Sequence, residues 1–182
     1  YVILARSLAI QNRLDDSMRY YQRAIQLGIE DRIVYAELGS IYDLLGKYDK
    51  ALQTYQKYLK RKPLDADFHN QAGLSLLALQ RTEEGFKHLE QACALQPNND
   101  EFKKDLSYAL IETKQFKAAE KILEEMLQKR AYDISTLQLK VRLRLRQNRG
   151  KDATKLIHEI LKIDPDNLEA KFMLERIEHL VR

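Results

Sequence analysis

The chain has few of the residues that turn or cross-link a polypeptide. Its 182 residues include six Gly, three Pro, one Cys and no Trp. An all-β protein needs a turn at the end of each short strand, so this scarcity of Gly and Pro excludes that class and predicts an all-α protein. Hydrophobic residues make up 45% of the sequence, which is enough to bury a core and argues against disorder.

Long hydrophobic runs and cysteine pairs are also missing. The longest uncharged apolar stretches, such as Leu74 to Leu79, are far shorter than the roughly 20 residues that span a bilayer, so no transmembrane segment is predicted. The lone Cys93 cannot form an internal disulfide, which favours a cytoplasmic location but leaves the compartment unknown. The chain starts at Tyr1 without a Met, so we expect it to be part of a longer protein.

Motifs for catalysis and metal binding are absent from the sequence. The four histidines, His69, His88, His158 and His179, show no i, i+4 spacing and have no carboxylate or thiol motif around them. The sequence also lacks HExxH, CxxC, GxGxxG and the P-loop pattern, the local signatures of zinc hydrolysis, redox, dinucleotide and nucleotide chemistry. We therefore predict a protein that is not an enzyme and that has no cofactor.

Positive charge is concentrated towards the C-terminal end of the sequence. The formal net charge of +4 is too small over this length to make nucleic acid the expected partner. Between Arg130 and Lys151, seven basic residues stand against one acid, Asp133, so this window carries +6 and the remainder sums to −2. The candidate basic patch, whose members would share one face of a helix, consists of Arg142, Arg146 and Arg149.

A single repeating period organises the sequence. Pro63 and Pro97 are 34 positions apart, as are Gly39 and Gly73, and Pro165 follows Pro97 by twice that spacing. This period predicts five helical hairpins and a closing helix. The predicted boundaries are 1–31 for repeat 1, which has a truncated start, 32–65 for repeat 2, 66–99 for repeat 3, 100–133 for repeat 4, 134–167 for repeat 5 and 168–182 for a capping helix.

The second repeat carries the clearest pattern. Its first helix places Tyr35, Leu38, Gly39 and Tyr42 at i, i+3, i+4 and i+7, the stripe of a buried helix face, and Gly46 closes the helix. A second helix follows and stops before a proline, which cannot continue it. One face of this second helix carries Ala51, Tyr55 and Tyr58, and the proline is Pro63.

These residues resemble the pattern of the tetratricopeptide repeat (TPR) family, and the resemblance extends over essentially the whole chain. It implies an all-α fold in which antiparallel helix pairs stack into a right-handed superhelical solenoid. It also implies a non-catalytic scaffold or adaptor that binds another protein.

The fifth repeat departs from the family pattern. In strict register, Lys140 and Arg144 stand where the family buries Leu and Tyr, so we expect the first helix of this repeat to be rotated or slid by about one residue. The segment from Leu139 to Leu145 alternates like a strand, yet its place in the period favours a helix.

In the family, a concave inner surface is formed mainly by the first helix of each hairpin. The corresponding residues of repeats two to four are largely apolar here, and exposed apolar surface usually has a binding partner, in this case a peptide or an amphipathic helix. The predicted partner-binding groove consists of Ala36, Ser40, Asp43, Leu44, Asn70, Leu74, Leu77, Ala78, Lys104, Tyr108, Ile111 and Glu112.

Three alternatives to this assignment remain open. In the first, the terminal helix or the rest of a longer protein already covers the groove. In the second, the basic patch binds an acidic protein segment, nucleic acid or an anionic membrane, although a merely solvated helix explains the same charges. In the third, the array is the targeting arm of a larger enzyme.

Overall fold

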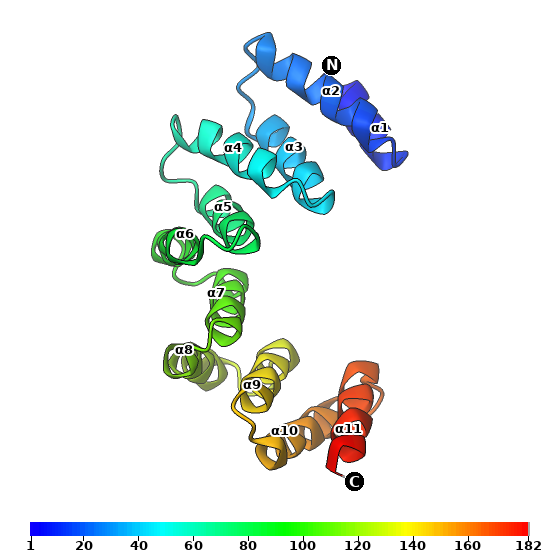
Figure 1. The fold of residues 1–182 in the computed structure, drawn as a ribbon, viewed down its shortest axis with the longest axis vertical. Helices are drawn as coiled ribbons and strands as arrows, with labels where there is room; N and C mark the ends of the chain where they lie inside the picture. Colours follow the sequence, from blue (N-terminus) through cyan, green and yellow to red (C-terminus); the bar gives the residue numbers. More distant parts are fainter. Residues whose placement is uncertain (182) are drawn as a thin grey trace. The chain divides into compact units, whose positions relative to one another are not determined.

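A computed structural model describes the backbone of residues 1–181 and the side chains of residues 1–177, and its regular secondary structure is entirely helical (Figure 1). Arg182, the last residue of the predicted capping helix, lies outside the described residues. The helices are α1 (Val2–Ile10), α2 (Leu14–Gln26), α3 (Arg32–Leu44), α4 (Tyr48–Leu59), α5 (Ala66–Ala78), α6 (Thr82–Leu95), α7 (Asp100–Glu112), α8 (Phe116–Lys129), α9 (Ile134–Arg146), α10 (Gly150–Ile163) and α11 (Leu168–Val181).

The helices recur along the chain with the period of the sequence. Helices α3, α5, α7, α9 and α11 begin at residues 32, 66, 100, 134 and 168, and α2, α4, α6, α8 and α10 begin at residues 14, 48, 82, 116 and 150. The prediction of an all-α helical solenoid is therefore confirmed. The helices form two compact units, Tyr1–Asn98 and Asn99–Arg182, termed unit 1 and unit 2.

An Asp or Asn residue caps the N-terminus of each first helix from α3 onwards, and of α11. A side-chain oxygen of Asp31, Asp65, Asn99 and Asp133 accepts a hydrogen bond from a backbone N–H of the turn that follows. Asn167 caps α11 in the same way at 3.0 Å. Each cap satisfies an N–H that has no partner within the helix, which typically stabilises a helix by about 1 kcal/mol.

A residue with left-handed backbone conformation follows each first helix from α1 to α9. Gly46 has a φ of 67°, and Asn12, Gln80, Lys114 and Asn148 take the equivalent positions with φ between 59° and 63°. Glycine adopts this conformation without steric cost, as expected for a residue that closes a helix, and Asn tolerates it. Gln80 and Lys114 have neither advantage, so their backbones are strained.

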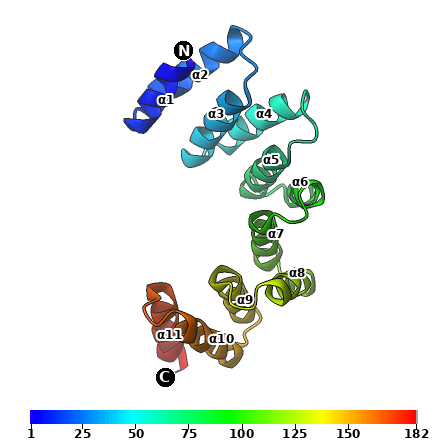
Figure 2. The same cartoon turned by 180° about the vertical axis from the view of Figure 1, so that it is seen from behind.

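The core of unit 1 is rich in tyrosine. Tyr21, Tyr35 and Tyr55 are at most 1% exposed. Tyr58 stacks on Phe68 with ring centroids 4.1 Å apart, and Tyr55 meets Phe68 edge-on at 5.7 Å, so neighbouring helices share one aromatic cluster. Each helix from α1 to α5 contacts the next one in unit 1, and Figures 1 and 2 show this stacking in chain order. These tyrosines are framework residues.

The fifth hairpin, in unit 2, keeps the common register. Helix α9 is helical from Ile134 to Arg146, and Leu137 and Val141 are buried in it. Arg144 stands where the second repeat has Tyr42; its side chain is 11% exposed, and its guanidinium pairs with both carboxylate oxygens of Glu120. The expected rotation or slide is wrong, because this ion pair neutralises the arginine in place.

Glycines allow the two helices of a hairpin to approach closely in unit 1. A Cβ atom added to Gly39 of α3 would lie 2.2 Å from Cε1 of Tyr55 on α4. A Cβ added to Gly73 of α5 would lie 2.8 Å from Cγ of Leu89 and 3.0 Å from the carbonyl oxygen of Gly85, both on α6. Since packed atoms do not approach so closely, a methyl group at either position displaces the neighbouring helix or side chain.

Gly39→Ala should lower the free energy of unfolding by about 1–3 kcal/mol, and Gly39→Leu by more, because Tyr55 is buried and held by a hydrogen bond to Asp43. Urea unfolding followed by circular dichroism measures the change. Gly150→Ala is the control, since a Cβ at Gly150 meets no atom within 4 Å. Equal effects of the two Ala substitutions would contradict the close-approach mechanism.

Relief of backbone strain should stabilise the protein. Gln80→Gly and Lys114→Gly should each raise the free energy of unfolding by about 0.5–1 kcal/mol, because glycine removes the left-handed penalty and loses only part of that gain as chain entropy. Gly46→Ala imposes the opposite change and should destabilise. Thermal and urea unfolding of the three variants test the strain assignment, which fails if glycine at positions 80 and 114 destabilises.

Candidate partner-binding site

The first helices of unit 1 carry a row of exposed apolar side chains. Ile10 of α1, Leu44 of α3 and Ala78 of α5 occupy equivalent positions in successive repeats. Each is the last residue of its helix, and all three are exposed. Ile10 is 87% exposed and Leu44 is 74% exposed. Ser40 is exposed beside this row, whereas Ala36 and Leu74 are half-buried. Together these residues are termed the first-helix surface of unit 1.

A cleft between α1 and α3 extends the first-helix surface. It has a volume of about 350 Å³ and is lined by five predominantly small or apolar residues together with one ion pair at its rim. That pair joins Nε of Arg6 to a carboxylate oxygen of Glu37 at 2.9 Å. The remaining lining residues are Ala9, Ile10, Ala36, Ser40 and Ile41.

Three residues of the predicted groove in unit 1 pack against neighbouring helices: Asn70 is buried, and Leu77 and Asp43 are half-buried. Asn70 is only 3% exposed, on a helix that packs against both α4 and α6. Leu77 packs against α6, since a Cβ on Gly85 would lie 2.9 Å from its Cγ. Asp43 accepts hydrogen bonds from the Tyr55 hydroxyl at 2.7 Å and from the Ser75 hydroxyl at 2.8 Å.

The expected exposure of Asn70 in the groove is therefore wrong, whereas Leu77 and Asp43 keep part of their side chains accessible. Asn70 is covered because α5 has a helix on each side. Leu77 and Asp43 share one repeat position in the last turn of a first helix, and this turn points their side chains towards neighbouring helices.

Burial controls the titration of the Asp43 carboxylate. Desolvation raises the pKa of Asp43 above its ordinary value, and the hydrogen bonds from Tyr55 and Ser75 offset part of this shift. Burial and the adjacent Asp43 raise the pKa of Tyr55, so its hydroxyl stays a donor. The carboxylate therefore ties α3 to α4 and α5 and acts in the framework.

Unit 2 has a different surface on its first helices. A cleft of about 280 Å³ lies between α7, α9 and α11, and Lys104, Tyr108 and Arg142 contribute to it. Lys104 pairs with Glu101 at 3.0 Å and Asp133 at 3.7 Å. The Arg142 guanidinium lies over the Tyr108 ring, 4.8 Å from its centroid. This cleft is polar, and its two basic side chains already have partners.

Ile111, a predicted groove residue, is fully buried. Its predicted exposure is wrong, because it occupies the same position in the last turn of α7 as Asp43 does in α3. Glu112 follows it and is half-buried. The Glu112 carboxylate accepts from Arg142 at 3.0 Å and also pairs with Arg146.

The basic patch carries much less free charge than the sequence suggests. Arg142 and Arg146 share the Glu112 carboxylate, and Arg149 pairs with Asp152 at 2.6 Å. Sequence reasoning missed these partners, although Glu112 sits at the same place as Arg146 one repeat earlier. The three arginines of the patch thus face two carboxylates, and the group carries a net charge of +1 instead of +3.

Within the described residues, no group of three or more His, Cys, Asp or Glu side chains is arranged to hold a metal ion. Over the same part of the chain, no helix combines the length and the apolar character needed to cross a membrane.

Asp43 should make stability depend on pH in a specific direction. Its pKa is raised in the folded state, so the folded state binds this proton more tightly than the unfolded state does. The resulting stabilisation is present below the ordinary Asp pKa and is lost as pH rises through the raised pKa. Asp43→Asn removes this titration, while its amide can still accept from Tyr55 and donate to Ser75.

The free energy of unfolding of Asp43→Asn minus that of the wild type should therefore increase as the pH rises from the ordinary Asp pKa through the raised pKa of Asp43. Urea unfolding at a series of pH values gives this difference directly. Asp49→Asn, at an exposed acid of α4, is the matched control and should give a difference that varies less with pH. A difference for Asp43→Asn that is constant or falls with pH would contradict the assignment.

Comparisons with known proteins agree with the repeat geometry. Two family models described as tetratricopeptide repeat match the chain, one over residues 36–100 and the other over residues 76–143. Together they span more than half of the 182 residues. No curated protein matches the sequence.

Solved structures share the fold at low sequence identity. A tetratricopeptide repeat protein from Parabacteroides merdae is 13% identical with a TM-score of 0.85, and the match covers 99% of this chain and 72% of that one. The TPR protein YrrB is 18% identical with a TM-score of 0.72, covering 94% and 89%. TTC0263 from Thermus thermophilus is 17% identical with a TM-score of 0.74, covering 97% and 96%.

These identities show the fold alone, whereas the two family models identify the repeat itself. Proteins with this fold generally mediate protein–protein interaction. The regular spacing of the helices and the matching family models lead to one conclusion: the chain belongs to the tetratricopeptide repeat family.

Proposed function

We propose that the protein is a non-catalytic scaffold that holds a peptide or an amphipathic helix of a partner protein against the first-helix surface of unit 1. The observation that carries this proposal is the row of Ile10, Leu44 and Ala78, which lie at equivalent positions on three stacked helices. Regularly spaced apolar residues on one surface provide successive contact points for an apolar side of a ligand.

The energetics favour an apolar ligand side. Ile10 and Leu44 leave most of their side-chain surface in water, and burial of such side chains stabilises a complex by about 25 cal/mol for each Å² of apolar area removed from water. The cleft between α1 and α3 lies beside Ile10 and offers room for a further side chain. The Arg6 and Glu37 pair at its rim supplies polar groups that orient a ligand.

Relatives support a peptide as the ligand class. YrrB, which shares the fold, is described as a TPR protein with an unusual peptide-binding site. Here the exposed row on the first helices of unit 1 consists of the apolar residues Ile10, Leu44 and Ala78, so the proposal concerns a peptide with apolar side chains.

The alternative in which the basic patch binds a polyanion has less support. Glu112 and Asp152 pair with Arg142, Arg146 and Arg149, so a polyanion meets a net charge of +1 at this patch instead of +3. The third alternative, a targeting arm of a larger enzyme, is compatible with the proposal, because such an arm also works by holding a partner.

Leu44→Glu should abolish partner capture without loss of helical structure, because a charge replaces an exposed apolar contact and disturbs no core residue. Tagged wild-type and variant proteins are used to capture binding proteins from the source cells. Captured proteins are identified by mass spectrometry, and each candidate is then purified and titrated against the wild type and the variants by calorimetry.

Leu64→Glu is the matched control, since Leu64 and Leu44 are both 74% exposed and Leu64 lies in the connection between α4 and α5, outside the first-helix surface. The control should bind like the wild type. A partner whose affinity is unchanged by Leu44→Glu, or equally reduced by Leu64→Glu, does not bind at the proposed surface.

A further inference from the structure

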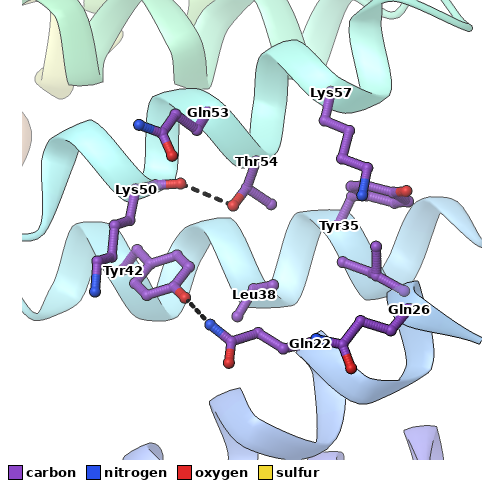
Figure 3. Close-up of a pocket in the computed structure, with 10 residues that line it drawn as sticks. Gln22, Gln26, Tyr35, Leu38, Tyr42, Lys50, Gln53, Thr54 and Lys57 are labelled. Atoms are coloured by element: carbon purple, nitrogen blue, oxygen red, sulfur yellow. Dashed lines mark hydrogen bonds between the residues drawn. The ribbon is translucent and has the colours of Figure 1, made fainter.

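The second helices of unit 1 form a separate surface with its own cleft. This α2–α4 cleft has a volume of about 440 Å³. Figure 3 shows Gln22 and Gln26 reaching into it from α2, Lys50 and Lys57 extending from α4, and Leu38 of α3 between them. The cleft therefore has an apolar floor and polar walls.

The same cleft recurs one repeat later. The α4–α6 cleft has a volume of about 420 Å³ and shares the wall helix α4 with the first cleft. Its lining residues follow those of the α2–α4 cleft by one repeat length. Gln56, Leu59, Lys60, His69 and His88 stand in the places of Gln22, Ile25, Gln26, Tyr35 and Thr54.

The lysines of these clefts have no acidic partner among the described residues, although the Lys50 ammonium lies over the Tyr42 ring, 5.9 Å from its centroid. Of the side chains that the structure describes, no acidic one lines either cleft. Among the described residues, Lys50, Lys57 and Lys60 make no ion pair, whereas the nearby Lys47 and Arg61 pair with Asp15 and Glu30. The three unpaired lysines all project from α4 or its C-terminal end, which forms a wall of both clefts. A ligand that carries negative charge is therefore complementary to this surface.

Two histidines, His69 and His88, form part of the α4–α6 cleft and contact each other. The carbonyl oxygen of Pro63 only accepts, so Nε2 of His69 donates to it at 2.9 Å. Nδ1 of His69 then accepts from Nδ1 of His88 at 3.0 Å. Burial and the neighbouring His69 lower the pKa of His88, so its ring stays uncharged near neutral pH. The positive charge assigned to this surface is therefore that of the lysines and not of His88.

The side-chain amides in the walls suit a peptide backbone. Each Gln amide has both a donor and an acceptor, the two groups that a backbone peptide unit offers in return. Gln22 and Gln26 are one helical turn apart on α2, and Gln53 lies on the facing wall of the same cleft. Gln22 donates one N–H to the Tyr42 hydroxyl and Gln26 accepts from Arg23, so the carbonyl oxygen of Gln22 and the NH2 group of Gln26 are the groups that would contact a peptide. The two clefts offer only three lysines, together with amides and an apolar floor. Nucleic-acid binding depends on many contacts between basic side chains and phosphates, so this surface fits a peptide better than a nucleic acid.

We propose that the second-helix surface of unit 1 is a second interaction site, which binds an extended acidic peptide segment of a partner protein. The glutamine amides hydrogen-bond the peptide backbone, and Lys50, Lys57 and Lys60 pair with its Asp or Glu side chains. This site is independent of the first-helix surface, so a partner can use either or both.

The experiment is a selection of random peptides, displayed on phage, against the wild-type chain. Enriched peptides should contain an excess of Asp and Glu. Synthetic copies should bind about tenfold more weakly to the double variant Lys50→Glu with Lys57→Glu, because two attractive pairs become repulsive. Backbone amide shifts in NMR spectra should map the bound peptide to α2, α4 and α6.

Two controls distinguish this site from a general effect of net charge and from the first-helix surface. Lys117→Glu with Lys121→Glu, at exposed positions of α8, also lowers the formal net charge from +4 to zero and should leave peptide affinity nearly unchanged. Leu44→Glu should also leave it unchanged. Circular dichroism and urea unfolding establish that each variant is folded.

The proposal is overturned if no peptide is enriched, if enriched peptides lack acidic residues, or if both lysine double variants weaken binding equally. Enriched peptides that lose affinity with Leu44→Glu and retain it with the α4 double variant also overturn it, and in that case they support the first-helix surface. Equal or tighter competition by single-stranded DNA assigns the lysines to nucleic acid instead.

Discussion

The close approach of the two helices within a hairpin is the constraint on which the surfaces of unit 1 depend. At Gly39 the backbone of α3 lies so near the Tyr55 ring that a methyl group does not fit, and Gly73 and Gly85 bring α5 and α6 together in the same way. This contact fixes the rotation of each first helix about its own axis. Once that rotation is fixed, the residues that remain exposed on α3 and α5 follow from it.

Repetition then turns single positions into rows. Because the hairpins share one register, Ile10, Leu44 and Ala78 occupy one row on the first helices. By the same rule, Gln22 and Gln56 take equivalent places in successive clefts between the second helices. One repeating sequence thus gives unit 1 two different rows of side chains. The row on the first helices is apolar, and the row on the second helices consists of amide and lysine side chains.

The repeat period, visible in prolines and glycines, predicted the helices and most of the buried stripe. It did not predict which residues at the edge of that stripe are accessible. Asp43, Leu77 and Ile111 share one repeat position, and the sequence placed all three on a groove, whereas the last turn of the helix points them at neighbouring helices. Their burial depends on side chains from other helices, which periodicity within one helix does not reveal.

Charge shows the same limit. The basic window of the fifth repeat looked like the most positive surface, yet Arg144 finds Glu120 on α8 and Arg146 finds Glu112 on α7. The lysines of α4 lie outside this basic window, yet Lys50 and Lys57 make no ion pair in the described structure. The net charge of a sequence window adds up the residues of that window alone. The charge that a ligand encounters also includes the carboxylates that folding brings next to those residues from other helices.

The recurrent capping residues, Asp31, Asp65, Asn99, Asp133 and Asn167, have a consequence for how such a chain changes over generations. Each repeat carries its own helix start, so in-frame duplication or excision of one repeat length leaves every boundary signal intact wherever the breakpoints fall within the period. Recombination can therefore lengthen or shorten this protein a hairpin at a time, and add or remove one contact point of each row with it.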